Sequence, residues 1–289
     1  METGFVVVEK VGGKSTVTRC FSKYPLKFII PKKGDCISCG LTIGTGCTTV
    51  LTTQASTKVY KSVGSKVSEQ VLESRIESNA FLVIIPDPVT CFSTARYSQK
   101  QVFRVVSDSS LVIVDWITSG RHESGEKWDF NLYKSTNHIF LEGDQPLFLD
   151  SILLEQGSMT SIAERMQDYQ VIAMVVLLGD GKIKEINQGS WLLGCRPKLK
   201  HAQHQVQEDM KRMMSQQFYS PSSTLRSHTK TSSDHGMPKP ALIASCSVFG
   251  PKGIGMVVRI AAMTTESVYS FLRHQLASLE PLLGASPYH

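Results

Sequence analysis

An acidic residue inside an apolar segment is the first feature of this sequence that suggests chemistry. Asp115 lies within residues 111–117, which are otherwise apolar, and a run of polar residues follows at positions 119–126. A buried carboxylate without a partner is costly. Two interpretations therefore stay open, namely a structural ion pair with Arg121 or Arg96, and a carboxylate that faces a cavity or an ion path.

Catalytic patterns in the sequence are incomplete. There is neither a G-x-S-x-G nucleophile motif nor an H-E-x-x-H metal motif. A metal-dependent hydrolase using Asp115, His122 and Glu126 is an alternative, but these residues lack a fixed-spacing ligand signature. Gly13-Lys14-Ser15 resembles the end of a phosphate-binding loop, but Val8 stands where that loop requires glycine. We expect a β-hairpin there instead.

Cysteine spacing raises the question of a zinc site, because Cys36-x-x-Cys39 has Cys47 nearby. Structural zinc sites normally use four nitrogen or sulfur ligands, and strand positions three apart point to opposite faces. We therefore favour buried cysteines without a metal, and a contact between one thiol and a soft metal stays open. The seven cysteines follow no disulfide framework, which favours reduced thiols and a cytoplasmic location.

The composition disfavours several classes of protein. The chain has 289 residues, with 31 Lys and Arg against 25 Asp and Glu, a net charge of +6. No basic stripe with interleaved aromatic residues occurs, so we expect no nucleic-acid partner. The N-terminus lacks a secretory pattern, and the longest apolar run, residues 171–178, is far shorter than the roughly 20 residues that span a bilayer. We expect no membrane partner.

Most of residues 1–200 is typical of an all-β body. Two pairs of segments flank glycine-containing turns and predict hairpins, namely 5–8 with 15–21 and 37–43 with 48–54. Further short strands are predicted at 58–62, 80–85, 101–106, 111–117, 127–134, 147–154 and 171–178. Residues 67–76 are ambiguous, because their apolar spacing fits a helix while their neighbours are strands.

The last part of the chain has a different character. A short helix is predicted near residues 158–166, and an amphipathic helix at 201–218. Residues 219–240 contain few large apolar side chains, so we expect a disordered linker. Residues 241–289 predict two paired strands and a closing amphipathic helix that packs on the body.

Several segments, taken in order, resemble the UreD (UreH) family of urease accessory proteins, in a form similar to the plant sequences. The similarity covers nearly the whole chain. It is carried by residues 52–62 (TTQASTKVYKS), 85–89 (IPDPV), 95–96 (AR), 115–121 (DWITSGR), 125–126 (GE) and 161–165 (SIAER).

This resemblance implies a mainly β, β-helix-like fold with a few helices, in which residues 67–76 form a strand. It implies a non-enzymatic scaffold that binds a helical accessory protein and, through it, a nickel-carrying GTPase. That assembly delivers nickel to apo-urease, so nickel would be a transient cargo. A β-rich adaptor with no metal role is the alternative function.

The resemblance also implies an internal nickel channel. We expect Asp35, Asp115 and Asp150 to face it, with Ser56 nearby, because polar family residues at the matching positions are associated with that channel. Asp115 and Asp150 each interrupt apolar segments. The alternative is a separate ion pair for each carboxylate, with one of Arg96, Arg121 or Lys58.

The sequence departs from the family pattern in two places. A Tyr- and Gly-rich stretch expected before Gly34-Asp35 is missing, and residues 189–202 are extra sequence. The missing piece should be a strand and turn of the β body, and its loss would leave an unpaired strand edge. We therefore expect a protein that is poorly soluble alone and is stabilised by the helical partner.

Overall fold

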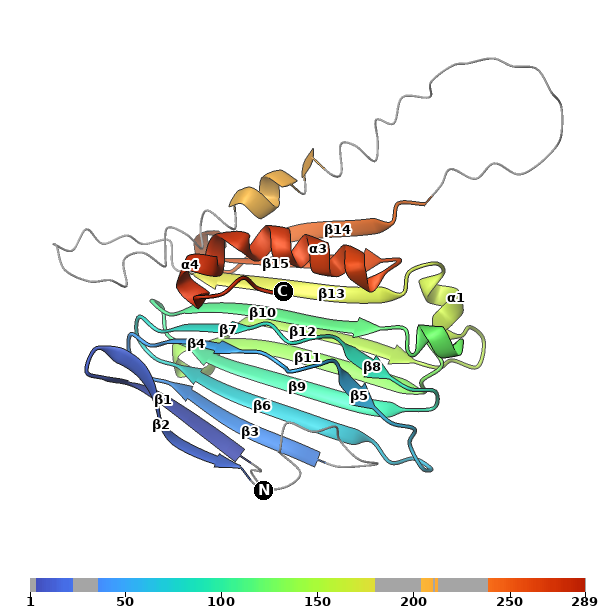
Figure 1. Ribbon diagram of the computed structural model, residues 1–289, viewed down its shortest axis with the longest axis horizontal. Coiled ribbons are helices and arrows are strands. Elements are labelled where there is room, and N and C mark those ends of the chain that lie inside the picture. The colour runs from blue at the N-terminus through green and yellow to red at the C-terminus, as the bar shows by residue number, and fades with distance from the viewer. Residues whose placement is uncertain (1–3, 23–35, 180–203, 210, 213–238, 289) are drawn as a thin grey trace, which may run out of the picture.

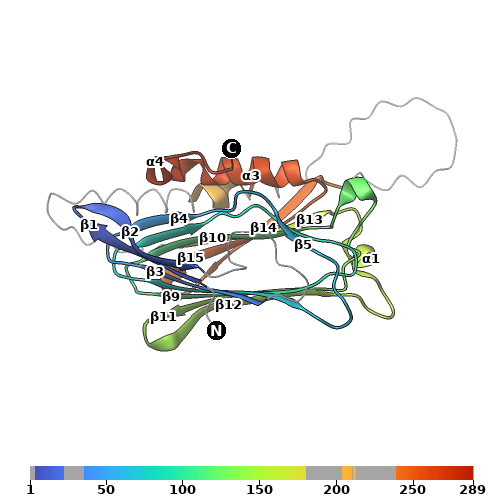
Figure 2. The same cartoon turned by 60° about the horizontal axis from the view of Figure 1, so that its bottom comes forward.

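The computed structural model describes residues 4–22, 36–179, 204–209, 211–212 and 239–288. Two β-sheets lie face to face, and helices cover the outer face of one of them (Figures 1 and 2). We call the sheets A and B. Within the described residues, sheet A has seven strands in the spatial order β12 (Gln145–Glu155), β11 (Leu132–Leu141), β9 (Arg96–Val105), β6 (Ser68–Ile76), β3 (Cys36–Ile43), β1 (Gly4–Val11) and β2 (Lys14–Ser22).

Sheet B is built from the segments that alternate with those of sheet A along the chain. Its main path follows the order β14 (Leu242–Phe249), β15 (Gly255–Ala262), β13 (Val171–Gly179), β10 (Ser110–Thr118), β7 (Phe81–Ile84) and β4 (Thr48–Leu51). Two short strands, β5 (Thr57–Val59) and β8 (Val89–Cys91), pair with each other, and β8 also pairs with β10.

The centre of the body is a solenoid of stacked coils. In sheet A, strands β1, β3, β6, β9 and β11 are parallel neighbours, and in sheet B strands β4, β7 and β10 are parallel. Each coil thus passes from sheet A to sheet B and back. Antiparallel strands extend the stack, namely β2 beside β1, β12 beside β11, and β13, β15 and β14 beyond β10. This is the mainly β, β-helix-like fold that the family resemblance implied.

Helix α3 (Thr265–Leu276) covers the outer face of sheet B (Figure 2). Thr264 caps its N-terminus by accepting a hydrogen bond from the backbone of Ser267, and its apolar side, including Val268 and Leu272, is buried. Trp116 of β10 packs edge-on against Tyr269 of this helix. Strand β10 is thus covered on both faces, by sheet A on the inside and by α3 on the outside. This explains why its sequence is almost continuously apolar.

The other helical elements are short. Helix α1 (Ile162–Met166) begins with a capping box between Ser161 and Glu164, and α4 (Glu280–Leu283) follows α3. Residues 204–209 and 211–212 are helical, and Val206 is buried with the apolar side of α3. Single 3-10 turns occur at η1 (His122–Ser124), η2 (Glu142–Asp144), η4 (Pro251–Gly253) and η5 (Ala277–Leu279).

Several sequence predictions are confirmed. Strands β1 and β2 form a hairpin across Gly12 and Gly13, whose φ angles of 56° and 78° suit a tight turn. Residues 68–76 form a strand, as the family resemblance implied, because tertiary pairing on both sides outweighs the helical apolar spacing. The paired strands β14 and β15 and the closing helix lie where they were predicted. Residues 219–238 of the predicted linker lie outside the described residues.

Two strand predictions were wrong. The segments around Gly44 and Gly46 are not a hairpin, since β3 pairs in sheet A and β4 pairs in sheet B. The glycines instead turn a corner between coils, where the Gly44 amide donates to the carbonyl of Val8. The strand predicted at 127–134 begins only at Leu132, because Trp128 has a φ of 59°, which an extended strand does not allow.

Truncating a side chain on the inner face of sheet B should strongly reduce the stability of the protein. Ile113 is fully buried in the apolar cluster between the sheets. Ile113→Ala should lower the free energy of unfolding by about 2–5 kcal/mol, because it removes methylene groups and leaves a cavity. Ile243→Ala on the edge strand β14, where the side chain is 37% exposed, should cost less than about 1 kcal/mol. Urea denaturation of both variants measures the difference, and equal losses would contradict the assigned core.

Candidate functional site

A band of polar side chains crosses the interior of the body, where apolar residues would be expected. It consists of Gln99, Gln101, Asp115, Ser135, Asn137 and Asp150, which we call the polar band. Strand register places its sheet A members side by side, with Gln99 beside Ser135 and Asn137 between Gln101 and Asp150. Apolar clusters flank it, one containing Phe103 and Ile139 and the other containing Tyr97 and Tyr133.

Asp115 is the centre of the polar band. It stands on β10 of sheet B and is 5% exposed. Three neutral donors from sheet A reach its carboxylate, namely Gln99 Nε2 at 3.1 Å, Ser135 Oγ at 2.5 Å and Asn137 Nδ2 at 2.7 Å. The hydroxyl of Tyr97 lies 3.0 Å from Gln70 Oε1 and 3.3 Å from Gln99 Oε1, so its one proton is shared between these two amide oxygens.

The protonation of Asp115 is set by opposing effects. Burial raises the pKa of its carboxyl above the ordinary value of 3.8, whereas the hydrogen bonds from Ser135, Asn137 and Gln99 lower the pKa. The negative charge of Asp150 raises the pKa further, and burial has the greatest effect. A nearby cation would therefore be favoured, because it would stabilise the ionised form of Asp115.

Asp150 lies at the other end of the polar band, and its side chain is 12% exposed. Arg259 of β15 donates from Nη2 to its Oδ1 at 2.7 Å. The second carboxylate oxygen, Oδ2, is buried and has no hydrogen-bond partner among the described residues, and the same holds for Oδ1 of the neighbouring Asn137. Each buried oxygen left without a donor costs about 1–3 kcal/mol. The fold therefore holds two acceptor oxygens on adjacent strands that lack a donor, although the carboxylate of Asp150 has Arg259 as its counter-ion.

The structure separates the four residues predicted for the nickel channel. Asp115 and Asp150 both belong to the polar band. Asp35 lies outside the described residues. Ser56 instead lines a pocket of about 630 Å³ at the end of the coils where β10 ends, together with Thr118 and His122.

The ion pairs suggested as alternatives for these carboxylates were mostly wrong. Asp115 is held by neutral donors, since Arg121 pairs with Glu126 and Arg96 lies 4.0 Å from Glu155. Asp150 does form an ion pair, but its partner is Arg259, which sequence reasoning did not identify.

The two metal alternatives from the sequence are not supported. No group of three or more His, Cys, Asp or Glu side chains that could hold a metal ion occurs among the described residues. Asp115 and Glu126 have separate partners, so the hydrolase arrangement is not formed. The expectation of two buried cysteines was also wrong, because Cys36 begins β3 and is exposed and Cys39 is only partly buried, whereas the nearby Cys47 is buried.

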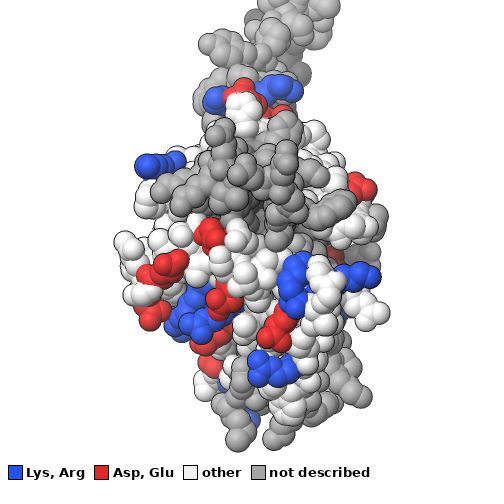
Figure 3. All heavy atoms as spheres, turned by 90° about the vertical axis from the view of Figure 1, so that its left-hand side faces the viewer, with Lys and Arg blue, Asp and Glu red and all other residues white. Residues whose placement is uncertain are grey.

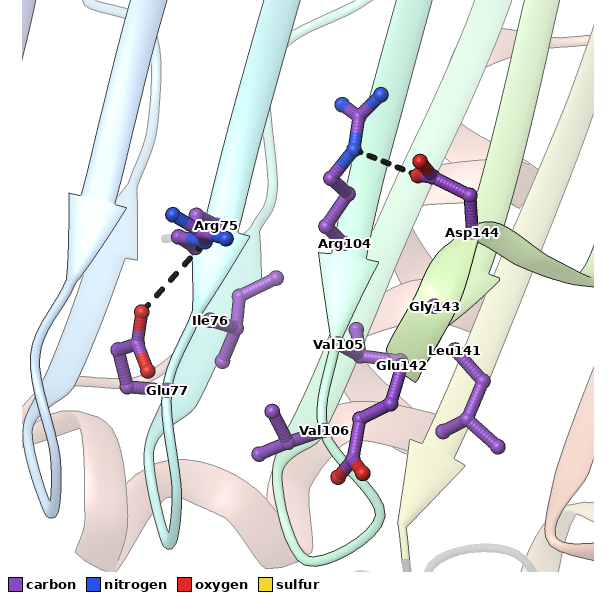
Figure 4. Close-up of a pocket in the computed structure, with 10 residues that line it drawn as sticks. All are labelled: Arg75, Ile76, Glu77, Arg104, Val105, Val106, Leu141, Glu142, Gly143 and Asp144. Carbon is purple, nitrogen blue, oxygen red and sulfur yellow. Dashed lines mark hydrogen bonds and ion pairs between the residues drawn. The ribbon is translucent and has the colours of Figure 1, made fainter.

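A second pocket lies at the opposite end of the coils and has a volume of about 360 Å³. Figure 4 shows that both of its arginines are already paired, with Arg104 Nε 3.0 Å from Asp144 Oδ1 and Arg75 Nε 3.6 Å from Glu77 Oε1. On this end of the body, acidic and basic side chains are interspersed rather than gathered by sign (Figure 3). The polar band, with its acceptors lacking donors, is therefore the stronger candidate site.

Sequence reasoning missed the neutral members of the polar band. Gln99, Gln101, Ser135 and Asn137 each alternate with outward-facing residues in β9 and β11, so they occupy positions where inner-facing apolar residues are usual. Each of the two adjacent strands has a pair of polar residues two positions apart, Gln99 with Gln101 and Ser135 with Asn137, and this pattern could have indicated the polar band. That signal becomes clear only when the parallel register of β9 and β11 is known.

The raised pKa of Asp115 predicts how stability varies with pH. Since the folded protein binds this proton more tightly than the unfolded chain, ionisation of Asp115 reduces stability as pH rises above its ordinary pKa. The stability of Asp115→Asn relative to the parent should thus increase as pH rises above the ordinary carboxyl pKa, by up to about 1.4 kcal/mol per pH unit. Urea denaturation across this range measures the difference. A difference that stays constant with pH would show that Asp115 titrates normally.

Comparison with known proteins agrees with the resemblance noted in the sequence. The family model described as "UreD urease accessory protein" matches residues 32–289. A "Urease accessory protein D" of Arabidopsis thaliana is 59% identical over 310 aligned residues, covering 100% of both chains.

More distant relatives carry similar names. The "Urease accessory protein D" of Oryza sativa subsp. japonica is 56% identical over 99% of this chain and 94% of its own length. A "Urease accessory protein UreD" of Sorangium cellulosum (strain So ce56) is 30% identical over 99% of this chain and 83% of its own. The matches extend over nearly the whole sequence, and the chain therefore belongs to the UreD family of urease accessory proteins.

Proposed function

We propose that this protein is a non-catalytic scaffold that helps to deliver nickel to apo-urease, with the polar band as the path of the ion. The observation that carries the proposal is the pair of buried oxygens without donors, Asn137 Oδ1 and Asp150 Oδ2, next to the buried carboxylate of Asp115. A divalent cation would coordinate these two oxygens and would bring to Asp115 the positive charge that its neutral donors do not supply.

The chemistry of these ligands suits a cargo ion. Carboxylate and amide oxygens are harder ligands than the imidazole and thiolate groups that hold nickel or zinc firmly. Nickel would be bound by Asp150 Oδ2 and Asn137 Oδ1, and then by Asp115. As the ion moves toward Asp115, Ser135 and Asn137 would lose their hydrogen bonds to that carboxylate. Their donor groups can then turn to water or to neighbouring acceptors. Weak, stepwise binding of this kind favours release at the destination.

We propose partner proteins for the steps that this chain has no motif to carry out. Gly13-Lys14-Ser15 lies at a hairpin between β1 and β2, so we assign GTP hydrolysis to a nickel-carrying accessory GTPase. A helical accessory protein would link that GTPase to this chain, and apo-urease would receive the ion.

No helix in the described part of the chain has the length and apolarity to cross a bilayer. We propose a cytoplasmic location, where the six described cysteines, none of which is in a disulfide bond, would stay reduced.

The nickel path predicts a specific defect in urease activation. When the chain is co-expressed with urease and the other accessory proteins, Asp115→Asn or Asp150→Asn should lower the nickel content of purified urease several-fold. The complex itself should still assemble, because both residues face the interior. Metal analysis of urease and co-purification of the accessory proteins measure the two effects.

Asp144→Asn is the matched control for this experiment. It removes a carboxylate that also pairs with an arginine, but at the opposite end of the coils, where its side chain is 72% exposed. Nickel content should then equal that of the parent. If both polar-band variants also gave the parental nickel content, a β-rich adaptor with no metal role would be the better account.

The partner assignment makes a separate prediction about solution behaviour. Leu149 and Leu153 on the edge strand β12 are each 57% exposed, and Val17 and Phe21 on the edge strand β2 are also exposed. Apolar side chains on strand edges favour association. The chain alone should therefore self-associate, and co-expression with the helical accessory protein should give a monodisperse complex in gel filtration. A monodisperse monomer that fails to capture this partner in a pull-down would contradict the assignment.

A further inference from the structure

Arg259 lies on the same inner face of sheet B as Asp115. Strand register aligns Asp115 of β10 with Met174 of β13, and Met174 with Arg259 of β15. Residues in register across a sheet point to the same face, so these three form a row that faces Asn137 and Asp150 of sheet A. The row leads from the buried carboxylate of Asp115 to Arg259, whose side chain is 48% exposed.

The contact between Arg259 and Asp150 uses only half of the carboxylate. Arg259 Nη2 reaches Asp150 Oδ1 at 2.7 Å, while Oδ2 is buried without a partner among the described residues. Arginine often pairs with both oxygens of a carboxylate at once. The one-sided contact leaves Oδ2 available to another cation, but it keeps a permanent positive charge beside that position.

We propose that Arg259 is the gate of the polar band, a displaceable counter-ion that neutralises Asp150 until a divalent cation takes its place. This inference rests on the proposed function and concerns the regulation of the same site. A divalent ion at Asp150 Oδ2 would lie within a few ångströms of the guanidinium and be repelled by it. Ion binding and the Arg259–Asp150 contact therefore compete.

The position of Arg259 allows this exchange. The Arg259 side chain is partly in water, so solvation replaces the contact that the guanidinium loses when it turns away. Asp150 is only 12% exposed and would be costly to leave unpaired, so the arginine leaves only when an incoming cation takes over the carboxylate. By contrast, Asp150 and Asn137 are held by the ladder between β11 and β12 and stay in place. The moving part of the gate is the arginine.

Titration of the full-length protein, purified as the complex with its helical partner, with Ni²⁺ in a calorimeter tests the gate. Arg259→Gln should strengthen nickel binding roughly tenfold, because it removes the competing charge. Arg259→Lys keeps the charge but shortens its reach, and it should strengthen binding less. Arg104→Gln is the matched control, since Arg104 pairs with Asp144 at 3.0 Å and is 46% exposed at the other end of the body. It should bind nickel as the parent does.

The outcomes distinguish the gate from the proposed function. If Asp150→Asn weakens nickel binding but Arg259→Gln leaves it unchanged, the ion path stands and the gate is wrong. If neither Asp115→Asn nor Asp150→Asn changes nickel affinity, the proposed function itself fails. A purely structural role for Arg259 predicts a lower melting temperature for Arg259→Gln without tighter nickel binding. Should Arg259→Gln not fold, unchanged affinity of the Arg259→Lys variant would overturn the gate.

Discussion

The buried carboxylate of Asp115 joins the two sheets, because it stands on sheet B and accepts three hydrogen bonds from sheet A. An isolated charge at this depth would be very costly, so the surrounding side chains must supply donors. Gln99, Ser135 and Asn137 do so only if β9 and β11 keep their register opposite β10. The need to solvate one acidic group thus divides the interior into two apolar clusters separated by a polar band.

Much of the fold was predictable because local patterns indicate strands and turns directly. The hairpin at Gly12 and Gly13, the paired strands near the C-terminus and the closing helix were all predicted from such patterns. Long-range pairing was not predictable in this way. Gly44 and Gly46 form a corner between coils. Two glycines between strand segments are equally typical of a hairpin, which is what the sequence pattern predicted. Parallel pairing between distant segments leaves no local signature that separates the two.

The candidate site was only half predictable for a related reason. Asp115 and Asp150 were identifiable, since a carboxylate among apolar residues is unusual in any strand. Their partners were not, because Gln99 and Asn137 are ordinary polar residues until the register brings them beside Asp115. Arg259 is more than one hundred positions from Asp150 in the sequence. Only the order of strands in sheet B shows that its side chain faces the polar band.

The central claim is that a divalent cation binds where the buried oxygens lack donors. Anomalous X-ray scattering at the nickel edge, from crystals of the full-length protein with its helical partner soaked in Ni²⁺, tests this most directly. The account predicts an anomalous peak in contact with Asp150 Oδ2 and Asn137 Oδ1, with the guanidinium of Arg259 turned toward solvent. A peak confined to other residues, with the Arg259–Asp150 pair intact and no nickel in the polar band, would contradict it.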